Sequence, residues 1–225
     1  MVFLLYAFWG APLGFSKKLV IFDVDGTLNM TEIYAVPAYK KVLREMGANG
    51  FTDEMLRDRI GAVFEDDIRY FFGSRAEEKK EEFERLIGEY WMKDVERKAK
   101  TFPHTEETLR ELKEKGYSLA VCSNAENKEI DLVLRALHIK DYFSYIQGIT
   151  EEGTKSHSLC RLLEKTEPEW AVMVGDRFYD KEAARDNGIP FIACLYGYGK
   201  KGEFSEMDLS ITEICRLPSM MERIK

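Results

Sequence analysis

Two aspartates near the N-terminus stand where a carboxylate is costly to place. Asp23 directly follows the apolar run 19–22, which is typical of a buried strand, and Asp25 stands two residues later. An unpaired carboxylate in an apolar interior is strongly disfavoured, and two neighbouring carboxylates repel each other. The rest of the chain must therefore supply a positive partner, or the acids must perform chemistry, or both.

Three further groups of polar residues lie at the ends of other predicted elements. Ser123 and Asn124 follow a second apolar run, and Asp176 and Asp180 follow a third, within the segment GDRFYD. Lys155 stands directly before a stretch with helical spacing. Ligands of parallel sheets bind beyond the carboxyl ends of the strands, so we expect these side chains to converge on one rim with the two N-terminal aspartates.

This set of side chains suits the transfer of a phosphoryl group. Oxygen-only acidic clusters without His or Cys favour a hard cation such as Mg²⁺. A carboxylate kept ionised by that cation and a lysine can attack phosphorus, and a second carboxyl can protonate the leaving oxygen and then activate water. Gly26 lets the backbone approach a phosphate closely, while Ser123, Asn124 and Lys155 can hold its oxygens.

Five short apolar runs are expected to form the strands that position these residues. After the second of them they alternate with segments of helical spacing, which predicts an α/β fold with a parallel sheet covered on both faces. The expected strands are 19–22, 119–122, 145–147, 171–174 and 191–194, with 208–211 as a sixth at the edge. The expected helices are 105–115, 127–137, 156–165 and 181–187.

The interval between the first and second strands breaks this alternation. From about residue 30 to residue 100 the pattern predicts only helices, at 35–46, 53–60, 65–72 and 75–98. The last of these carries one apolar stripe and an opposite charged face. The sequence therefore predicts an all-helical subdomain, residues 30–100, inserted into a core of residues 17–29 and 101–225.

Taken in order, the motifs resemble those of the haloacid dehalogenase superfamily, in particular the group of phosphoglycolate phosphatase and β-phosphoglucomutase-like enzymes. The resemblance extends from Lys18 to about Leu217 and rests on DVDGTL at 23–28, SN at 123–124, Lys155 and VGDRFYD at 174–180. It implies a Rossmann-like core with the sheet order 5-4-1-2-3. It also implies that the helical insertion is a cap that closes over the substrate.

The resemblance further implies a role for each motif residue. Asp23 would be the nucleophile, and Asp25 the general acid and base. Mg²⁺ would be bound by Asp176, by the carboxylate of Asp23 and by the backbone carbonyl of Asp25. Asp180 would support Asp176 or pair with Lys155, which steadies the nucleophile. The phosphate would be surrounded by Gly26, Thr27, Ser123, Asn124 and Lys155.

Departures from the family pattern leave the substrate subclass open. The tripeptide NMT at 29–31 stands where the family often has another acid and Ser or Thr, and Ser156 follows the lysine where it often has Pro. Arg177 is left open between contacting the substrate and pairing with an acid. The segment DRIGAVFEDD at 58–67 is similarly open between contacting the leaving group and connecting two helices.

These residues predict a Mg²⁺-dependent phosphatase that acts on a small phosphorylated metabolite. One alternative is a sugar phosphomutase on the same scaffold, in which an aspartyl-phosphate returns its phosphate to the substrate. Another is a binding protein without turnover, against which the presence of every catalytic residue type speaks. Asp25 argues against a dehalogenase, because the dehalogenases lack that second acid.

The bulk composition disfavours one class of partner and indicates the state of the thiols. The 225 residues carry a formal net charge of −7 with a mean hydropathy of −0.34. This acidic balance disfavours a nucleic-acid partner, which needs a basic face. Four widely spaced cysteines without a CxxC pair predict reduced thiols and a cytoplasmic protein. We expect a monomer or a homodimer.

The first 16 residues are expected to be an extension outside the fold. They are apolar from Val2 to Trp9. A signal peptide has a basic residue before such a run, and no Lys or Arg stands there. The run is also too short to span a bilayer. We therefore expect no membrane association from it.

Overall fold

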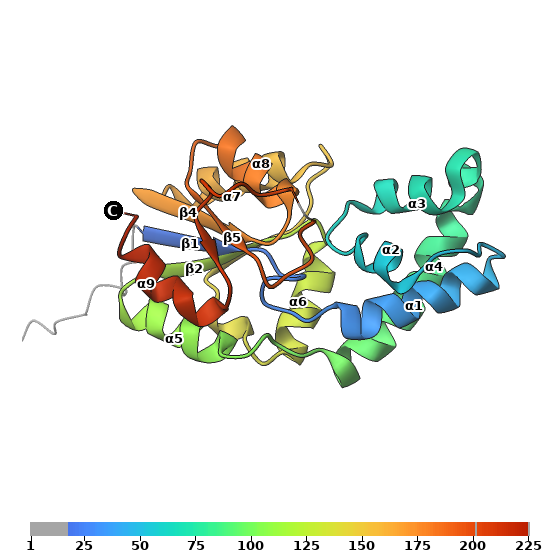
Figure 1. The fold of residues 1–225 in the computed structure, drawn as a ribbon, viewed down its shortest axis with the longest axis horizontal. Coiled ribbons are helices and arrows are strands. Elements are labelled where there is room, and N and C mark those ends of the chain that lie inside the picture. Colours follow the sequence, from blue (N-terminus) through green and yellow to red (C-terminus); the bar gives the residue numbers. More distant parts are fainter. Residues whose placement is uncertain (1–17, 201, 225) are drawn as a thin grey trace, which may run out of the picture.

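The computed structural model describes residues 18–200 and 202–224. Six strands form one sheet in the order β3-β2-β1-β4-β5-β6, and every neighbouring pair is parallel (Figure 1). The predicted order of five strands is confirmed, and β6 extends the sheet beyond β5. The extension predicted for residues 1–16 lies outside the described residues. The strands are β1 Lys18–Phe22, β2 Ser118–Cys122, β3 Tyr145–Gln147, β4 Trp170–Gly175, β5 Phe191–Cys194 and β6 Ser210–Ile211.

Strand β1 lies at the centre of the sheet between two apolar layers. Val20 and Phe22 belong to one layer, and Leu19 and Ile21 belong to the other. This explains the continuous apolar run, because a strand of a parallel sheet is buried on both faces. Phe22 pairs in register with both β2 and β4, so the residues that follow these three strands emerge at one edge.

Helices cover both faces of the sheet, as predicted. On the Val20 face pack α5 (Thr105–Glu114), α6 (Asn127–Ala136) and α9 (Leu217–Met221). On the Leu19 face pack α7 (Lys155–Thr166) and α8 (Phe178–Asp186). Helix α8 begins three residues earlier than the expected 181, because the carboxylate of Asp180 accepts the backbone N–H of Arg177 at 3.0 Å and satisfies its first turn.

The segment between β1 and α5, called the insert below, contains helices as its only regular elements and lies beyond the carboxyl ends of the strands (Figure 1). Its own core is aromatic, with the ring of Phe71 5.4 Å from that of Tyr39 and 5.7 Å from that of Phe83. The helices are α1 Glu32–Glu45, α2 Asp53–Arg57, α3 Phe64–Phe72 and α4 Ala76–Lys98, with a 3₁₀ turn at Gly73–Arg75.

Two further element boundaries differ from the expected ones. The helix expected at 53–60 ends at Arg57, and the following residues form a turn that includes Gly61 at φ +84°. The sixth strand comprises Ser210–Ile211 instead of 208–211. Within the described ranges, no helix has the length and apolar character needed to cross a membrane.

Candidate active site

The chain turns sharply directly after β1. Asp23 donates its backbone N–H to the carbonyl of Val174 at 2.9 Å, and Gly26 closes a turn by donating to the carbonyl of Asn29 at 3.0 Å. Gly26 has φ +87°, which side-chain-bearing residues rarely adopt. An added Cβ would lie 2.1 Å from Oδ2 of Asp176. A glycine at this position is therefore what lets the first loop approach Asp176.

The ammonium group of Lys155 lies between two carboxylates. Lys155 is the first residue of α7, and its side chain is 4% exposed. It forms an ion pair with Asp23 from the first loop and another with Asp180 of α8, at 2.5 Å. Both acids are buried. Lys155 is thus the positive partner that the buried Asp23 requires.

The site holds more buried negative charge than one lysine compensates. Burial raises the pKa of Asp23 to about 7 even though Lys155 opposes the shift. Burial, together with repulsion from Asp23 and Asp180, raises the pKa of Asp176 well above its ordinary value. Burial lowers the pKa of Lys155, but attraction by Asp180 and Asp23 outweighs this, so its pKa lies above the usual range. A further positive charge would stabilise the ionised carboxylates.

Asp176 completes an oxygen-rich cluster at the ends of β1 and β4. Its carboxylate accepts the backbone N–H of Tyr198 at 2.6 Å and the hydroxyl of Thr27 at 3.3 Å. Thr27, which the resemblance places around the phosphate, therefore uses its hydroxyl on Asp176. Carboxylate oxygens of Asp23, Asp176 and Asp180 all lie within 4.8 Å of one another. Such oxygen donors match a hard cation.

Asp25 has different partners from those of this cluster. Its Oδ1 accepts the hydroxyl of Thr31 at 2.5 Å and Nδ2 of Asn29 at 3.4 Å. Asn29 in turn donates to the hydroxyl of Tyr34 at 2.6 Å. Burial raises the pKa of Asp25, while the hydrogen bonds from Thr31 and Asn29 oppose the shift. A carboxyl with a raised pKa suits a group that must give and take a proton.

The loop after β2 brings Ser123 and Asn124 to the same edge. The hydroxyl of Ser123 accepts the backbone N–H of Ala125 at 3.2 Å. Nδ2 of Asn124 donates to the carbonyl of Gly61 in the insert at 2.9 Å, so the role of that side chain as a phosphate ligand stays a prediction. Among the described residues, the backbone N–H groups of Asp25 and Asn124 meet no acceptor of the protein, and they are therefore available to an anion.

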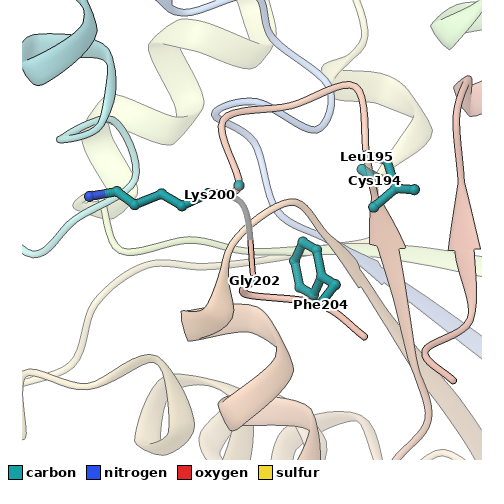
Figure 2. A pocket seen from close by; sticks show the side chains of 6 residues that line it. Cys194, Leu195, Lys200, Gly202 and Phe204 are labelled. Carbon is teal, nitrogen blue, oxygen red and sulfur yellow. The ribbon is translucent and has the colours of Figure 1, made fainter. Parts of the chain in front are cut away.

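Two hollows lie near this edge. One, of about 640 Å³, is lined by Lys155 of the site, Tyr179 of α8, and Val63 and Asp66 of the insert. The segment 58–67 thus borders space next to the site as well as connecting two helices. A smaller hollow, of about 220 Å³, lies at the end of β5 beside Phe204 (Figure 2).

Comparison with known proteins shows the family of the chain. A family model described as haloacid dehalogenase-like hydrolase matches residues 20–194. The chain belongs to the haloacid dehalogenase-like hydrolase family. Phosphoglycolate phosphatase of Aquifex aeolicus is 29% identical over 189 residues, which cover 81% of this chain and 87% of the relative. Tyrosine-protein kinase PtkA of Mycobacterium tuberculosis is 28% identical over 196 residues, which cover 83% of this chain and 65% of the relative.

Solved structures show the same fold. A haloacid dehalogenase-like hydrolase of Streptococcus pneumoniae superposes with a TM-score of 0.81 at 21% identity, covering 90% of this chain and 97% of that one. The structure of PtkA from Mycobacterium tuberculosis gives a TM-score of 0.76 at 26% identity, covering 92% and 98%. The chain thus shares its fold with both of these proteins over about nine-tenths of its length.

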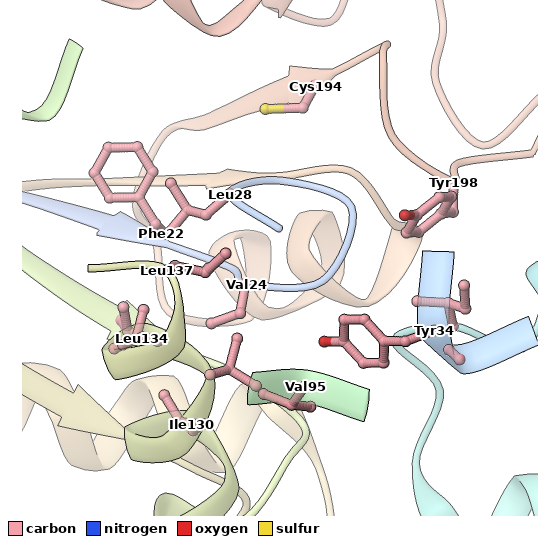
Figure 3. Packing of buried hydrophobic residues seen from close by; sticks show 14 of the residues in the cluster. Phe22, Val24, Leu28, Tyr34, Val95, Ile130, Leu134, Leu137, Cys194 and Tyr198 are labelled. Carbon is pink, nitrogen blue, oxygen red and sulfur yellow. The ribbon is translucent and has the colours of Figure 1, made fainter. Parts of the chain in front are cut away.

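For some residues around the site of this haloacid dehalogenase-like hydrolase, the neighbouring sequence does not indicate that they contact the site. Tyr34 projects from α1 toward Val24 and Val95, and its hydroxyl reaches the loop that holds Asp25 (Figure 3). Tyr198 meets Asp176 only through its backbone N–H. A backbone contact of this kind leaves no residue-type preference for a motif to reveal.

Arg177, whose role the sequence leaves open, pairs with an acid. Its guanidinium lies 3.4 Å from the carboxylate of Glu203, which also accepts the backbone N–H of Phe178 at 2.9 Å. Nη1 of Arg177 reaches backbone carbonyls of the insert, whereas its buried Nε has no hydrogen-bond partner among the described residues. The structure thus assigns Arg177 contacts within the protein.

Proposed function

We propose that this enzyme, a phosphatase of the haloacid dehalogenase-like family, uses Mg²⁺ and an aspartyl-phosphate intermediate to hydrolyse a small phosphate monoester. One observation carries the proposal. Asp23 is a buried carboxylate held by Lys155, beside the further acids Asp176 and Asp180, while Asp25 stands next to it with separate hydrogen-bond partners. The nucleophile, the compensating positive charge and the proton donor would thus be three separate groups.

The acidic cluster fits a magnesium ion. Its donors are carboxylate oxygens. When ionised, these carboxylates carry more negative charge than the single positive charge of the Lys155 ammonium group can neutralise. The ligands would be the carboxylates of Asp23 and Asp176 and the backbone carbonyl of Asp25, with Asp180 supporting them through Lys155. When bound, the cation would reduce the repulsion between the anionic phosphate and the carboxylate that approaches it.

The reaction would proceed in two steps at Asp23. In the first, a carboxylate oxygen of Asp23 attacks phosphorus, the bond from phosphorus to the ester oxygen breaks, and Asp25 gives its proton to the leaving alcohol. In the second, Asp25 takes a proton from water, which attacks the phosphorus and releases inorganic phosphate and free Asp23. Lys155, the Ser123 hydroxyl and the backbone N–H groups of Asp25 and Asn124 would hold the phosphate oxygens.

The insert would act as a cap that excludes water and contacts the organic part of the substrate. The hollow beside Lys155, bordered by the insert, supports this assignment of residues 30–100, with 17–29 and 101–225 as the core. The relatives named phosphoglycolate phosphatase make phosphoglycolate the first substrate to test. Four free cysteines among the described residues support a cytoplasmic location, and we expect a monomer or a homodimer.

Phosphate release from a panel of phosphorylated sugars, glycolate, nucleotides and p-nitrophenyl phosphate tests the proposal. Each substrate is assayed with Mg²⁺ and with EDTA, using the wild type, Asp23→Asn, and Asp53→Asn as a matched surface control. The proposal expects Mg²⁺-dependent release that Asp23→Asn loses and Asp53→Asn keeps, because Asp53 is exposed and outside the site. Silence across the panel would contradict it and favour the phosphomutase or the binding protein.

A further inference from the structure

Two core side chains bind the backbone of one short segment of the insert, residues 58–61. Nη1 of Arg177 donates to the carbonyl of Ile60 at 2.7 Å and to that of Asp58 at 3.2 Å. Nδ2 of Asn124 donates to the carbonyl of Gly61 at 2.9 Å. The core therefore contacts this segment through three backbone acceptors within four residues.

The insert itself supplies no donor for these acceptors. Within the described ranges, no other hydrogen bond reaches the carbonyl oxygens of Asp58, Ile60 or Gly61. They follow the last turn of α2, where carbonyls lack partners within the helix. Ile60 is 1% exposed, and a buried carbonyl without a donor is costly. The segment thus depends on the core to satisfy its backbone.

Arg177 is built into the core side of this contact. Its side chain is 4% exposed and is anchored by the carboxylate of Glu203 at 3.4 Å. A Cβ added at Gly61 would lie 3.6 Å from Cγ of Arg177, so the segment also packs closely against the arginine stem. Arg177 directly follows Asp176, and Asn124 directly follows Ser123. Both donors are therefore fixed to the loops that carry the site.

We propose that Arg177 and Asn124 are positioning residues that hold residues 58–61 of the insert against the core beside the site. The loops after β2 and β4, which carry Ser123 and Asp176, then also set the position of the insert. This inference goes beyond the proposed function and does not rest on it, because the contact joins two parts of the chain without any substrate.

Lys200 provides a matched control on the same segment. It pairs with the carboxylate of Asp58 at 3.0 Å, and its side chain extends away from Phe204 toward the insert (Figure 2). Both partners are about half exposed, at 46% and 39%, and exposed pairs of this kind contribute little. Removing Lys200 changes the charge at the segment but leaves its backbone acceptors satisfied.

Hydrogen–deuterium exchange of the full chain without substrate tests the proposal. The amides of Arg59, Ile60 and Ala62 donate within this turn and report on its opening. In Arg177→Ala we expect their exchange to become about tenfold faster or more, the effect of losing charge-assisted hydrogen bonds. We expect a smaller increase in Asn124→Ala and none in Lys200→Ala.

A rescue experiment separates positioning from a general structural role. Millimolar guanidinium chloride, far below denaturing concentrations, should slow exchange of the segment again in Arg177→Ala but not in Asn124→Ala. The free ion can occupy the space beside Glu203 that the arginine leaves. An unchanged segment in Arg177→Ala, or faster exchange spread over β1 and β4, would overturn the proposal.

A second substitution covers the case in which Arg177→Ala does not fold. Lysine keeps the charge of Arg177 but lacks the planar fork of donors. In Arg177→Lys the amides of the segment should therefore exchange faster than in the wild type. Exchange of the segment equal to the wild type in both Arg177→Lys and Asn124→Ala would contradict the proposal.

Discussion

Gly26 is the position where one added methyl group should disturb the site most. In Gly26→Ala the new Cβ would lie 2.1 Å from Oδ2 and 2.6 Å from Cγ of Asp176, and 2.7 Å from Cδ2 of Tyr198. Real Cβ atoms essentially never approach other atoms closer than 3.0 Å, so Asp176 or the first loop must move. Because the interior is close-packed, that movement has no free space to use.

The loss of unfolding free energy in Gly26→Ala has two parts, and the same substitution at a second glycine measures one of them alone. Alanine at the positive φ of Gly26 costs about 1–2 kcal/mol of unfolding free energy. Overpacking against Asp176 costs about 1–3 kcal/mol more. Gly47 has a similar φ of +72°, but nothing lies within 4 Å of an added Cβ there. Gly47→Ala should therefore carry only the first part.

Urea unfolding and phosphate release measure the two consequences. Gly26→Ala should be less stable than Gly47→Ala by about 1–3 kcal/mol, the overpacking part alone. It should also lose turnover, because Asp176 is displaced, whereas Gly47→Ala should turn over like the wild type. Equal stabilities of the two variants, or normal turnover in Gly26→Ala, would refute the close packing of the first loop on Asp176.

Three further predictions concern the nucleophile, the cation and a buried acid of the insert. In Asp23→Asn, phosphate release should fall to background while circular dichroism shows a folded chain; near-normal release would remove Asp23 as the nucleophile. EDTA should silence the enzyme, Mg²⁺ should restore it and Ca²⁺ should not, because its larger, looser coordination misplaces the nucleophile; indifference to EDTA would end the metal role of Asp176. Burial raises the pKa of Asp67 to about 6, although Arg59 opposes the shift. The ordinary pKa of an Asp in an unfolded chain is about 3.9, so the folded chain binds a proton at Asp67 more tightly than the unfolded chain does. The resulting stabilisation is complete below about pH 4 and is lost as the pH rises through 6. When the pH is lowered from 7 to 5, the unfolding free energy of the wild type in urea should therefore rise by about 1.3 kcal/mol more than that of Asp67→Asn. Equal rises in the two proteins would contradict this.

Local patterns in the chain were enough to predict the framework of the site. The apolar run that became β1 is continuous because both faces of a central parallel strand are buried. The pair Asp23 and Asp25 at its end required a compensating charge, which the structure places at Lys155, 132 residues further along the chain. The sheet order followed from the resemblance of these motifs to a family, and the helical insert followed from the helical spacing of residues 30–100.

Boundaries and capping were predicted less well. Helix α8 starts earlier than expected because Asp180, assigned to the site, also satisfies the backbone of Arg177. The second helix of the insert stops earlier than expected, at Arg57, and the carbonyls of Asp58, Ile60 and Gly61 beyond it accept hydrogen bonds from the core. In both places a contact outside the periodic pattern decides where the helix begins or ends.

The sequence by itself determined which residues lie at the strand ends, because continuous apolar runs mark the buried strands. The chemical properties of Asp, Lys and Ser side chains then indicated what reaction they could support. Only the tertiary structure decided what Arg177 and Asn124 contact. Arg177 meets the carbonyls of Ile60 and Asp58 across separations of 117 and 119 residues. A backbone carbonyl has the same chemistry in every residue, so no sequence pattern marks which ones the folded chain brings to an arginine.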